Sequence, residues 1–430
     1  MPITRRSFIH RSLGVGATLV VGCGPEDRGD GSRGAGGGGG SDTGQDAGTF
    51  DDVGASLPDL GPGPGGDDAG CAAGCTDPFA GGELVRQVPF AREDEVDFHR
   101  RSGEGWDGRL RTDLSRIDQD RRITPNEEFF IRTFYPYALD PDDPWSIRVD
   151  GLVGRPRELT MGDLESRERS MGEHVLECSG NSSSGSFGLL SAAKWEGVSL
   201  MDLLDEVGID RAATRVLVSG VDEHRRESTH STPGASWIYS FDQIERAGGF
   251  LATGMNGEPL SLDHGFPVRM YMPGWYGCTC IKWVNEIRLV DDSEPSTPQM
   301  QEFAGRTHQE GVPAMARDFR PATMDQAAMP IRIEQWGVDD RTVYKVVGIS
   351  WGGSKVTDAL AIRFNDDEPY VPVDVCPPME GNSSWTVWSH AWRPEAPGRY
   401  QIHLAVEDVT VPTNRLLVER YDRWVDVREV

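Results

Sequence analysis

The sequence predicts an α+β domain followed by an all-β sandwich, with a signal segment and a polar tether in front of them. Between residues 83 and 324, short apolar strands and isolated helices alternate with long loops, which is typical of an α+β domain. From 325 to 430, short apolar strands are separated by turn residues, as in a β-sandwich. The chain has 430 residues, more than one ordinary core accommodates, so two folded domains are expected.

Residues 1–23 have the pattern of an export signal. Arg5 and Arg6 precede Phe8 and an apolar stretch that is too short to span a bilayer. The paired arginines indicate a twin-arginine signal, whose route carries proteins that are already folded. Small residues before Cys23 resemble a lipobox. We therefore expect a lipid on Cys23 and a membrane-tethered lipoprotein in the periplasm or on the cell surface; a generic signal peptide with an incidental cysteine is the alternative.

Residues 24–82 are dominated by Gly, Asp, Ser and Pro and include five consecutive glycines at 36–40. Such a composition cannot bury enough apolar surface to offset the chain entropy, so the segment is predicted to be a disordered tether. Cys71 and Cys75 lie near its end. In an oxidising compartment we expect a small disulfide loop there rather than a metal site, because no histidine is nearby.

Two helices and two strands can be placed in the domain 83–324. Ser199 is an N-cap before a run that is apolar on one face, and Gly208 ends this run. Ser240 and Gln243 form a capping-box pattern, and a glycine pair ends the second helix. Two apolar runs are typical of buried strands: 215–219 and 268–272.

The boundary of the sandwich lies in the segment between Pro321 and Pro330, at about residue 325. Beyond it, turn residues separate segments with the composition of strands. The expected strands are 343–350, 359–364, 385–392 and 400–406.

Two segments contain residues suited to chemistry. Cys178 lies in Leu-Glu-Cys-Ser-Gly-Asn, a loop too polar for a core, although a single cysteine is more often a small buried hydrophobe. His264, Arg269 and Lys282 lie in or after glycine-rich turns. Such turns can present several donors to one anion, such as a phosphate; solvated charges on surface turns are the alternative.

Together these segments resemble the sulfite oxidase family. The resemblance covers roughly residues 95–425, and its motifs occur in the family's order. They are Phe129-Phe130-Ile131-Arg132, Trp145–Gly151, the cysteine before Ser-Gly-Asn, Trp195–Leu200, Asn256–Leu260, His264-Gly-Phe-Pro-Val-Arg269, Pro273–Gly277, Lys282-Trp283 and Trp385–Trp388. The resemblance implies a sulfite-oxidase-like molybdopterin-binding domain, then an immunoglobulin-like sandwich that forms a homodimer.

The resemblance also implies a role for each matched residue. Cys178 would be the thiolate ligand of molybdenum, a soft donor suited to a redox metal. Arg132 would face the metal and the substrate, and His264 with Arg269 would bind the phosphate of the molybdopterin cofactor. The cofactor contacts implied in all are Phe130, Ile131, Arg132, Thr133, Phe134, Asp222, His264, Arg269, Cys280, Ile281 and Lys282.

The function implied is that of an exported molybdenum-cofactor oxidoreductase that transfers an oxygen atom to a lone pair of its substrate. The two electrons released would pass to a separate acceptor. One alternative is a reductase of a sulfoxide, nitrate or a similar oxo-donor on the same scaffold. Another is a tethered binding protein without a cofactor, against which Cys178, His264 and Arg269 argue.

Three departures from the family pattern concern the substrate. Arg132-Thr133-Phe134 replaces the family's Arg-Asn-His, and Ser182–Ser184 replace basic residues. Pro233 stands where the family has a tyrosine, for which Tyr239 or His230 is a candidate substitute. An anion would then be held mainly by Arg132, so the sequence leaves the substrate open between sulfite and a neutral oxo-donor.

The charge of the chain bears on its partners. A formal net charge of −26 argues against nucleic acid as a partner, because a polyanion would be repelled. Neither His-Pro-Gly-Gly nor Cys-x-x-Cys-His occurs, so no haem segment is evident. We therefore expect an external electron carrier, such as a basic cytochrome c, which the acidic chain would attract.

Overall fold

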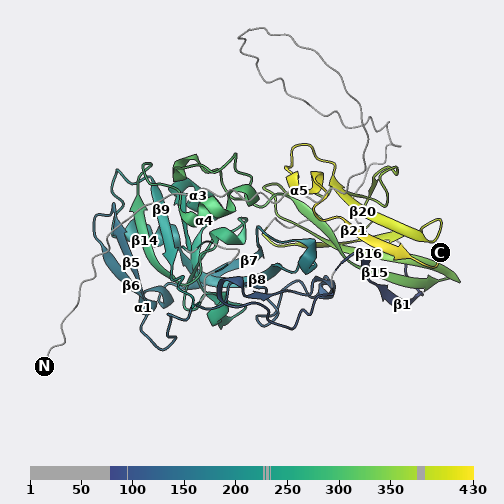
Figure 1. The fold of residues 1–430 in the computed structure, drawn as a ribbon, viewed down its shortest axis with the longest axis horizontal. Coiled ribbons are helices and arrows are strands. Elements are labelled where there is room, and N and C mark those ends of the chain that lie inside the picture. The colour runs from purple at the N-terminus through teal and green to yellow at the C-terminus, as the bar shows by residue number, and fades with distance from the viewer. Residues whose placement is uncertain (1–77, 94, 226–227, 229–231, 233, 375–382) are drawn as a thin grey trace, which may run out of the picture. The chain divides into compact units, whose positions relative to one another are not determined.

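The structure is a computed structural model that describes residues 78–430 except 94, 226–227, 229–231, 233 and 375–382 (Figure 1). The expected signal with Cys23, residues 24–77 of the tether with Cys71 and Cys75, and the residues His230, Pro233 and Cys376 lie outside the described residues. The last five residues of the predicted tether, 78–82, are ordered, because Phe79 is buried and packs against Trp336, with ring centroids 5.5 Å apart. In the part of the chain that is described, no helix is long and apolar enough to cross a membrane.

The first domain contains two five-stranded sheets (Figure 1). The strands of one are β5 (Ser146–Gly151), β6 (Arg157–Thr160), β9 (Arg215–Gly220), β10 (Ser236–Ser240) and β14 (Val284–Val290). Their order is β10-β9-β14-β5-β6, with β14 and β5 parallel and the other neighbours antiparallel. In β9, Val216 and Val218 are buried while their neighbours are partly exposed, as expected when one face of a sheet covers the core.

The second sheet of this domain lies closer to the candidate site. Its strands are β7 (Arg169–Glu177), β8 (Leu190–Ser199), β11 (Phe250–Met255), β12 (Glu258–Pro259) and β13 (Arg269–Tyr271). The order is β12-β11-β8-β7, and β13 also pairs with β11. Every residue of β11 is buried. A short ribbon of β3 (Arg109–Leu110) and β4 (Ile131–Arg132) completes the domain.

The two predicted helices are confirmed. The helices of the described residues are α1 (Met161–Glu165), α2 (Leu200–Val207), α3 (Phe241–Ala247), α4 (Pro298–Phe303) and α5 (Asn414–Leu417). The Ser199 hydroxyl accepts a hydrogen bond from the backbone N–H of Asp202 and caps α2. Ser240 and Gln243 form the predicted capping box of α3, and Gly248 ends it in the left-handed conformation.

The C-terminal domain is the predicted β-sandwich. One sheet has the order β1 (Glu83–Val88), β15 (Ala327–Val338), β16 (Arg341–Trp351) and β19 (Thr386–Trp392). The other has the order β18 (Val371–Pro372), β17 (Leu360–Arg363), β20 (Gly398–Val406), β21 (Arg423–Val427) and β2 (Phe90–Ala91). Trp392 of the first sheet stacks on Phe364, which follows β17 of the second, with ring centroids 4.2 Å apart. The four expected strands correspond to β16, β17, β19 and β20.

The first two strands belong to the sandwich, although the sequence places them in the domain 83–324. β1 pairs with β15, with Val88 opposite Ile333, and β2 pairs with β21, with Phe90 opposite Val425. Figure 1 shows the purple β1 beside the green and yellow strands of the sandwich. This pairing joins segments far apart in the sequence, and no local pattern encodes such a pairing.

We expect Gly348→Ala to lower the free energy of unfolding by about 1–3 kcal/mol. A methyl group at this position of β16 would overlap the ring of Trp388 and lie 2.6 Å from the carbonyl oxygen of Met329. Gly337→Ala is the matched control, because its methyl group would meet only Val85, at 3.9 Å. Urea unfolding of both variants checks this, and equal stability of the two would contradict the packing described.

Candidate functional site

Two adjoining cavities in the described part of the chain share Cys178, Arg132 and Phe303 in their walls. The inner cavity has a volume of about 130 Å³ and the outer one about 570 Å³. Of the residues that the sequence predicts for the site, the following line the inner cavity: Phe130, Ile131, Arg132, Thr133, Cys178, Asp222, His264, Arg269, Cys280, Ile281 and Lys282. The fold thus brings together residues from segments that are far apart in the sequence.

Cys178 follows the last residue of β7, in a turn that fixes its position. Its N–H donates to the carbonyl oxygen of Leu189 (3.0 Å), and its own carbonyl accepts from the N–H of Asn181 (2.9 Å). The Asn181 side chain in turn accepts from the Leu189 N–H (3.1 Å). The residue is 8% exposed and forms no disulfide. Its thiol is therefore held at the junction of the two cavities.

The other two described cysteines differ from Cys178 in their setting. Cys278 and Cys280 line only the inner cavity. Burial raises the pKa of Cys278 well above the ordinary thiol value and also raises the pKa of Cys280. Both thiols are therefore neutral near pH 7. Of the three described cysteines, only Cys178 also lines the outer cavity.

Arg269 places a buried cation in the wall of the inner cavity. Its Nη1 donates to the carbonyl oxygen of His264 (3.1 Å) and its Nη2 to that of Cys280 (3.3 Å). Its Nε is buried and has no hydrogen-bond partner among the described residues. A buried donor without a partner costs about 1–3 kcal/mol, and an anion in the cavity could satisfy it.

His264 lies beside Arg269 and is neutral. Burial, with the charges of Lys282 and Arg269, lowers the pKa of His264 to about 3. Its Nδ1 lies 2.8 Å from the hydroxyl oxygen of Ser261, and its Nε2 lies 3.2 Å from the carbonyl oxygen of Phe129. The ring can therefore donate from Nε2 and accept at Nδ1 without a proton from solvent.

Lys282 lines the inner cavity, but its ammonium group is committed to the backbone. Nζ donates to the carbonyl oxygens of Arg132 (3.0 Å), Thr133 (2.6 Å) and Asp263 (2.8 Å). These bonds use all three donors of an ammonium group. They also hold Thr133 in a left-handed conformation (φ 75°) and so fix the direction of Arg132. In this structure Lys282 positions Arg132.

Asp222 fixes Arg132 from another side. Its Oδ1 accepts from the indole N–H of Trp106 (2.6 Å), and its Oδ2 accepts from the N–H groups of Gly234 (2.7 Å) and Ala235 (3.1 Å). The carbonyl oxygen of Trp106 then accepts from the Arg132 guanidinium. Trp106 lines the inner cavity and was missed by the sequence reasoning, because it belongs to no motif that we matched.

Phe134 is the predicted site residue that lies in neither cavity wall. Its ring packs over Gly108, where a Cβ atom would overlap it, and the Arg101 guanidinium lies 4.3 Å from the ring centroid. The Phe134 N–H donates to the carbonyl oxygen of Gly105 (2.8 Å). Phe134 therefore supports the loop that carries Trp106.

The outer cavity is rich in cations that the sequence reasoning did not select. Besides Arg132, it is lined by the arginines Arg109, Arg306, Arg415 and Arg420. Burial and the neighbouring charge of Arg132 lower the pKa of Arg109 to about 10, so both groups remain cations near pH 7. The expectation that mainly Arg132 would hold an anion is therefore too narrow.

Of the two candidate substitutes for the missing tyrosine, only Tyr239 belongs to the described part of the chain, since His230 lies outside it. Tyr239 is fully buried, its hydroxyl donates to the carbonyl oxygen of Thr279, and it lines neither cavity. Ser182 lines neither cavity, and its hydroxyl lies 3.0 Å from that of Ser184. Positive charge is supplied instead from residues distant in sequence.

Glu177, the residue before Cys178, is held by hydrogen bonds from side chains of the sandwich domain. It is 1% exposed. Its Oε1 accepts from Arg415 Nη1 (3.1 Å) and the Tyr421 hydroxyl (2.7 Å), and its Oε2 accepts from the Trp351 indole (3.1 Å). Burial would lower the pKa of Arg415, but the Glu177 carboxylate raises it above the ordinary arginine value. Arg415 also donates to the carbonyl oxygen of Ser179 (3.1 Å), so it holds both sides of Cys178.

Comparison with known proteins gives this site a context. Residues 134–298 match the family described as oxidoreductase molybdopterin binding domain. The chain is 29% identical over 262 residues to the sulfite oxidase of Gallus gallus, which covers 56% of this chain and 52% of that protein. It is 34% identical over 191 residues to a nitrate reductase [NAD(P)H] of Betula pendula, covering 40% of this chain and 21% of that protein. The chain thus spans about half the length of the sulfite oxidase that it matches.

A solved structure has a similar fold. The sulfane dehydrogenase SoxCD from Paracoccus pantotrophus aligns with a TM-score of 0.56 at 16% identity. The alignment covers 83% of this chain and 96% of that chain. The predicted fold class, an α+β molybdopterin-binding domain followed by a sandwich, is confirmed.

We expect Arg415→Met to lower the free energy of unfolding by about 3–5 kcal/mol, because it leaves the buried carboxylate of Glu177 without its cation. Arg399→Met is the control, since Arg399 and Asp426 form an exposed ion pair of 2.7 Å, and its loss should cost at most about 1 kcal/mol. Guanidinium unfolding measures both. Equal effects of the two substitutions would show that the ion pair does not stabilise the domain contact.

Proposed function

Because residues 134–298 are a molybdopterin-binding oxidoreductase domain related to that of the sulfite oxidases, we propose that this protein catalyses oxygen-atom transfer with a small anionic substrate. The observation that carries the proposal is the place of Cys178 at the junction of the two cavities. One cavity offers buried donors for a cofactor, and the other offers guanidinium groups for a substrate.

The residues of the inner cavity fit the molybdenum–molybdopterin cofactor. Arg269 supplies a buried cation whose Nε has no partner in the described part of the chain, which suits a phosphate group. His264 lies beside it. Cys178 supplies a soft sulfur ligand for the metal, at the point where this cavity opens into the outer one. These residues would hold the cofactor.

When bound, the cofactor supplies a two-electron redox centre that can exchange an oxygen atom with a substrate. The protein's own part is to bind and orient the substrate beside Cys178. Arg132 lies in both cavity walls and is fixed by Lys282 and by Trp106. A guanidinium held in this way needs little reorganisation to donate to an anion. The free energy of substrate binding is therefore not reduced by the entropy cost of ordering this side chain.

The outer cavity favours an anion over a neutral substrate. Arg109, Arg306 and Arg420 line it together with Arg132. The Nε of Arg420 is buried without a hydrogen bond to any described residue. Several guanidinium groups around one cavity repel one another unless an anion enters, which disfavours the alternative of a sulfoxide reductase. A sulfur oxyanion such as sulfite is the substrate class that we propose.

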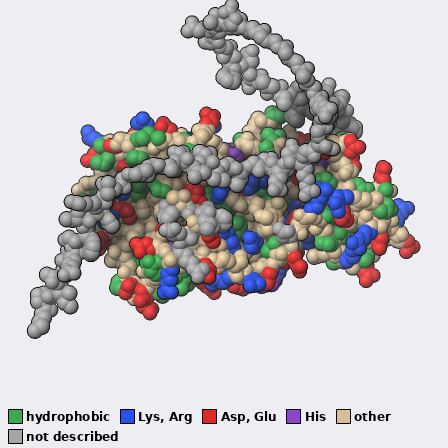
Figure 2. Space-filling model, viewed as in Figure 1, with side chains coloured by type: hydrophobic (Ala, Val, Ile, Leu, Met, Phe, Trp, Pro, Cys, Tyr) green, Lys and Arg blue, Asp and Glu red, His purple; other side chains and the backbone are tan. Residues whose placement is uncertain are grey.

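The remaining parts of the proposal concern location and partners. The twin-arginine pattern and Cys23 support export and a lipid anchor, and the resemblance of the sandwich supports a homodimer. The net charge of −26 supports a basic electron carrier such as a cytochrome c. On the face drawn in Figure 2, acidic and basic side chains are interspersed, so we expect attraction by the total charge rather than by one patch on this face.

Protein produced in cells that make the cofactor should contain close to one molybdenum per chain. In Cys178→Ala, the bond between the metal and the protein's sulfur should be absent, and the activity should be lost. Molybdenum-edge X-ray absorption would then show one sulfur neighbour fewer than in the unsubstituted protein. Cys278→Ala is the matched control and should retain both, because Cys278 does not lie at the junction of the two cavities. No molybdenum in the unsubstituted protein would instead support a binding protein without a cofactor.

Arg306→Met should raise the KM for sulfite about tenfold or more, since a charge-assisted hydrogen bond contributes about 1.5–3 kcal/mol. Molybdenum content should stay unchanged. Arg317→Met, at an exposed position outside both cavities, is the control and should leave KM unchanged. Steady-state kinetics with sulfite and with a methyl sulfoxide distinguish the candidates: turnover of the sulfoxide alone would contradict the proposed substrate class.

A further inference from the structure

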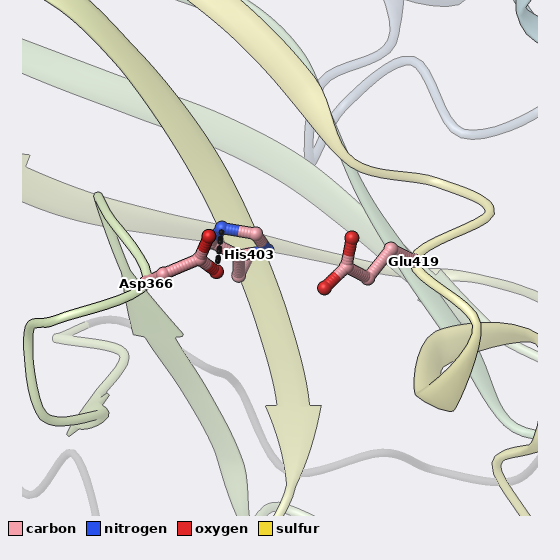
Figure 3. A group of neighbouring side chains, drawn as sticks. All are labelled: Asp366, His403 and Glu419. Carbon is pink, nitrogen blue, oxygen red and sulfur yellow. Dashed lines mark ion pairs between the residues drawn. The ribbon is translucent and has the colours of Figure 1, made fainter. Parts of the chain in front are cut away.

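A second group of potential metal ligands lies in the sandwich domain, and none of its residues lines either cavity. Asp366 follows β17, His403 lies in β20, and Glu419 follows α5. One ligand atom from each of the three side chains lies within 4.8 Å of the others. Figure 3 shows the two carboxylates approaching His403 from opposite sides. The three residues come from different segments, so the fold and not a local motif brings them together.

The buried imidazole of His403 points into this group. Its side chain is 2% exposed. Nδ1 contacts the carboxylate of Asp422, which lies behind the ring. Nε2 lies 3.3 Å from Asp366 Oδ1, yet it is buried and forms no hydrogen bond with any described residue. An acceptor on Nδ1 places the proton there and leaves the lone pair of Nε2 directed at the Asp366 carboxylate.

Such an arrangement is favourable when a cation lies between the groups. A lone pair that faces carboxylate oxygens is repelled by them, and a metal ion removes this repulsion. The contact between Asp422 and Nδ1 is the pairing in which a carboxylate orients a metal-bound histidine. Arg363 donates to the same Oδ1 of Asp366 (3.2 Å) and so holds this carboxylate toward the ring.

We propose that Asp366, His403 and Glu419 bind one divalent transition metal ion of the zinc class. One imidazole nitrogen and two carboxylate oxygens are a ligand set that Zn²⁺ accepts, with water in the remaining position. Asp366 and Glu419 are exposed, so the ion and the water reach the site from solvent. The rival state is a doubly protonated His403 that bridges the carboxylates without a metal.

The site would fix a segment that reaches the outer cavity. Glu419 lies between Arg415 and Arg420 in the sequence, and both arginines line that cavity. Arg420 donates to the carbonyl oxygen of Asn181, in the loop of Cys178. A metal ion held by Glu419 would therefore restrain both arginines. This consequence rests on the proposed function, whereas the metal site does not.

The test uses the full chain, stripped with a chelator and titrated with ZnCl₂ in competition with a chromogenic chelator. We expect one zinc ion per chain, with only nitrogen and oxygen neighbours in zinc-edge X-ray absorption. Asp366→Asn and Glu419→Gln should each raise the dissociation constant at least about tenfold. Asp367→Asn is the matched control, an exposed carboxylate in the same loop outside the group, and should leave it unchanged.

Each outcome decides the proposal. Lack of zinc binding supports the metal-free state of His403 and overturns the proposal. Sulfur neighbours in the absorption spectrum, or equal affinity in all three carboxylate variants, place the zinc elsewhere and also overturn it. His403→Ala should abolish binding. His403 is buried, so the His403→Ala variant could fail to fold. In that case the test relies on Asp366→Asn and Glu419→Gln, which alter exposed side chains. Molybdenum content and activity toward sulfite are measured separately from zinc binding. A failure of the zinc site can therefore be distinguished from a failure of the proposed function.

Discussion

The buried ion pair between Glu177 and Arg415 is the constraint on which the site depends. It joins β7 of the first domain to α5 of the sandwich domain, immediately before Cys178 in the chain. A buried pair of this kind gives little net stability relative to an apolar contact, but it allows few alternative arrangements. Trp351 and Tyr421 add two more donors from the sandwich, so the position of Cys178 is determined by both domains.

The same principle applies to Arg132. Its backbone is held by Lys282, which donates to the carbonyl oxygens of Arg132 and Thr133. Its guanidinium donates to the carbonyl oxygen of Trp106, whose indole donates to Asp222. Lys282 and Asp222, which the motifs mark as cofactor contacts, thus position the side chain of Arg132 in this structure. The charge of the outer cavity is supplied by arginines on several segments, and no single segment determines the whole cavity.

Local patterns predicted much of the fold. The caps at Ser199 and Ser240 and the sandwich strands were evident because they depend on neighbours in sequence. The place of β1 and β2 was not, because their partners are β15 and β21. The residues of the candidate site also fall into those that a local motif predicts and those that it does not. Motifs located Cys178 and Arg269, whereas Trp106, Arg306 and Arg420 belong to no motif that we matched and are brought to the cavities only by tertiary packing.

The pairing of β1 with β15 and of β2 with β21 makes the start of the folded part a component of the C-terminal domain. The sheets of the sandwich acquire their outermost strands, β1 and β2, from residues that precede the first domain, while β15 and β21, which pair with them, follow that domain. A fragment that starts at residue 325 would therefore expose two unpaired sheet edges, which invites association with other chains. The second sheet of the sandwich is complete only after β21 has been synthesised, so a unit with both sheets intact includes residues 83 to 427.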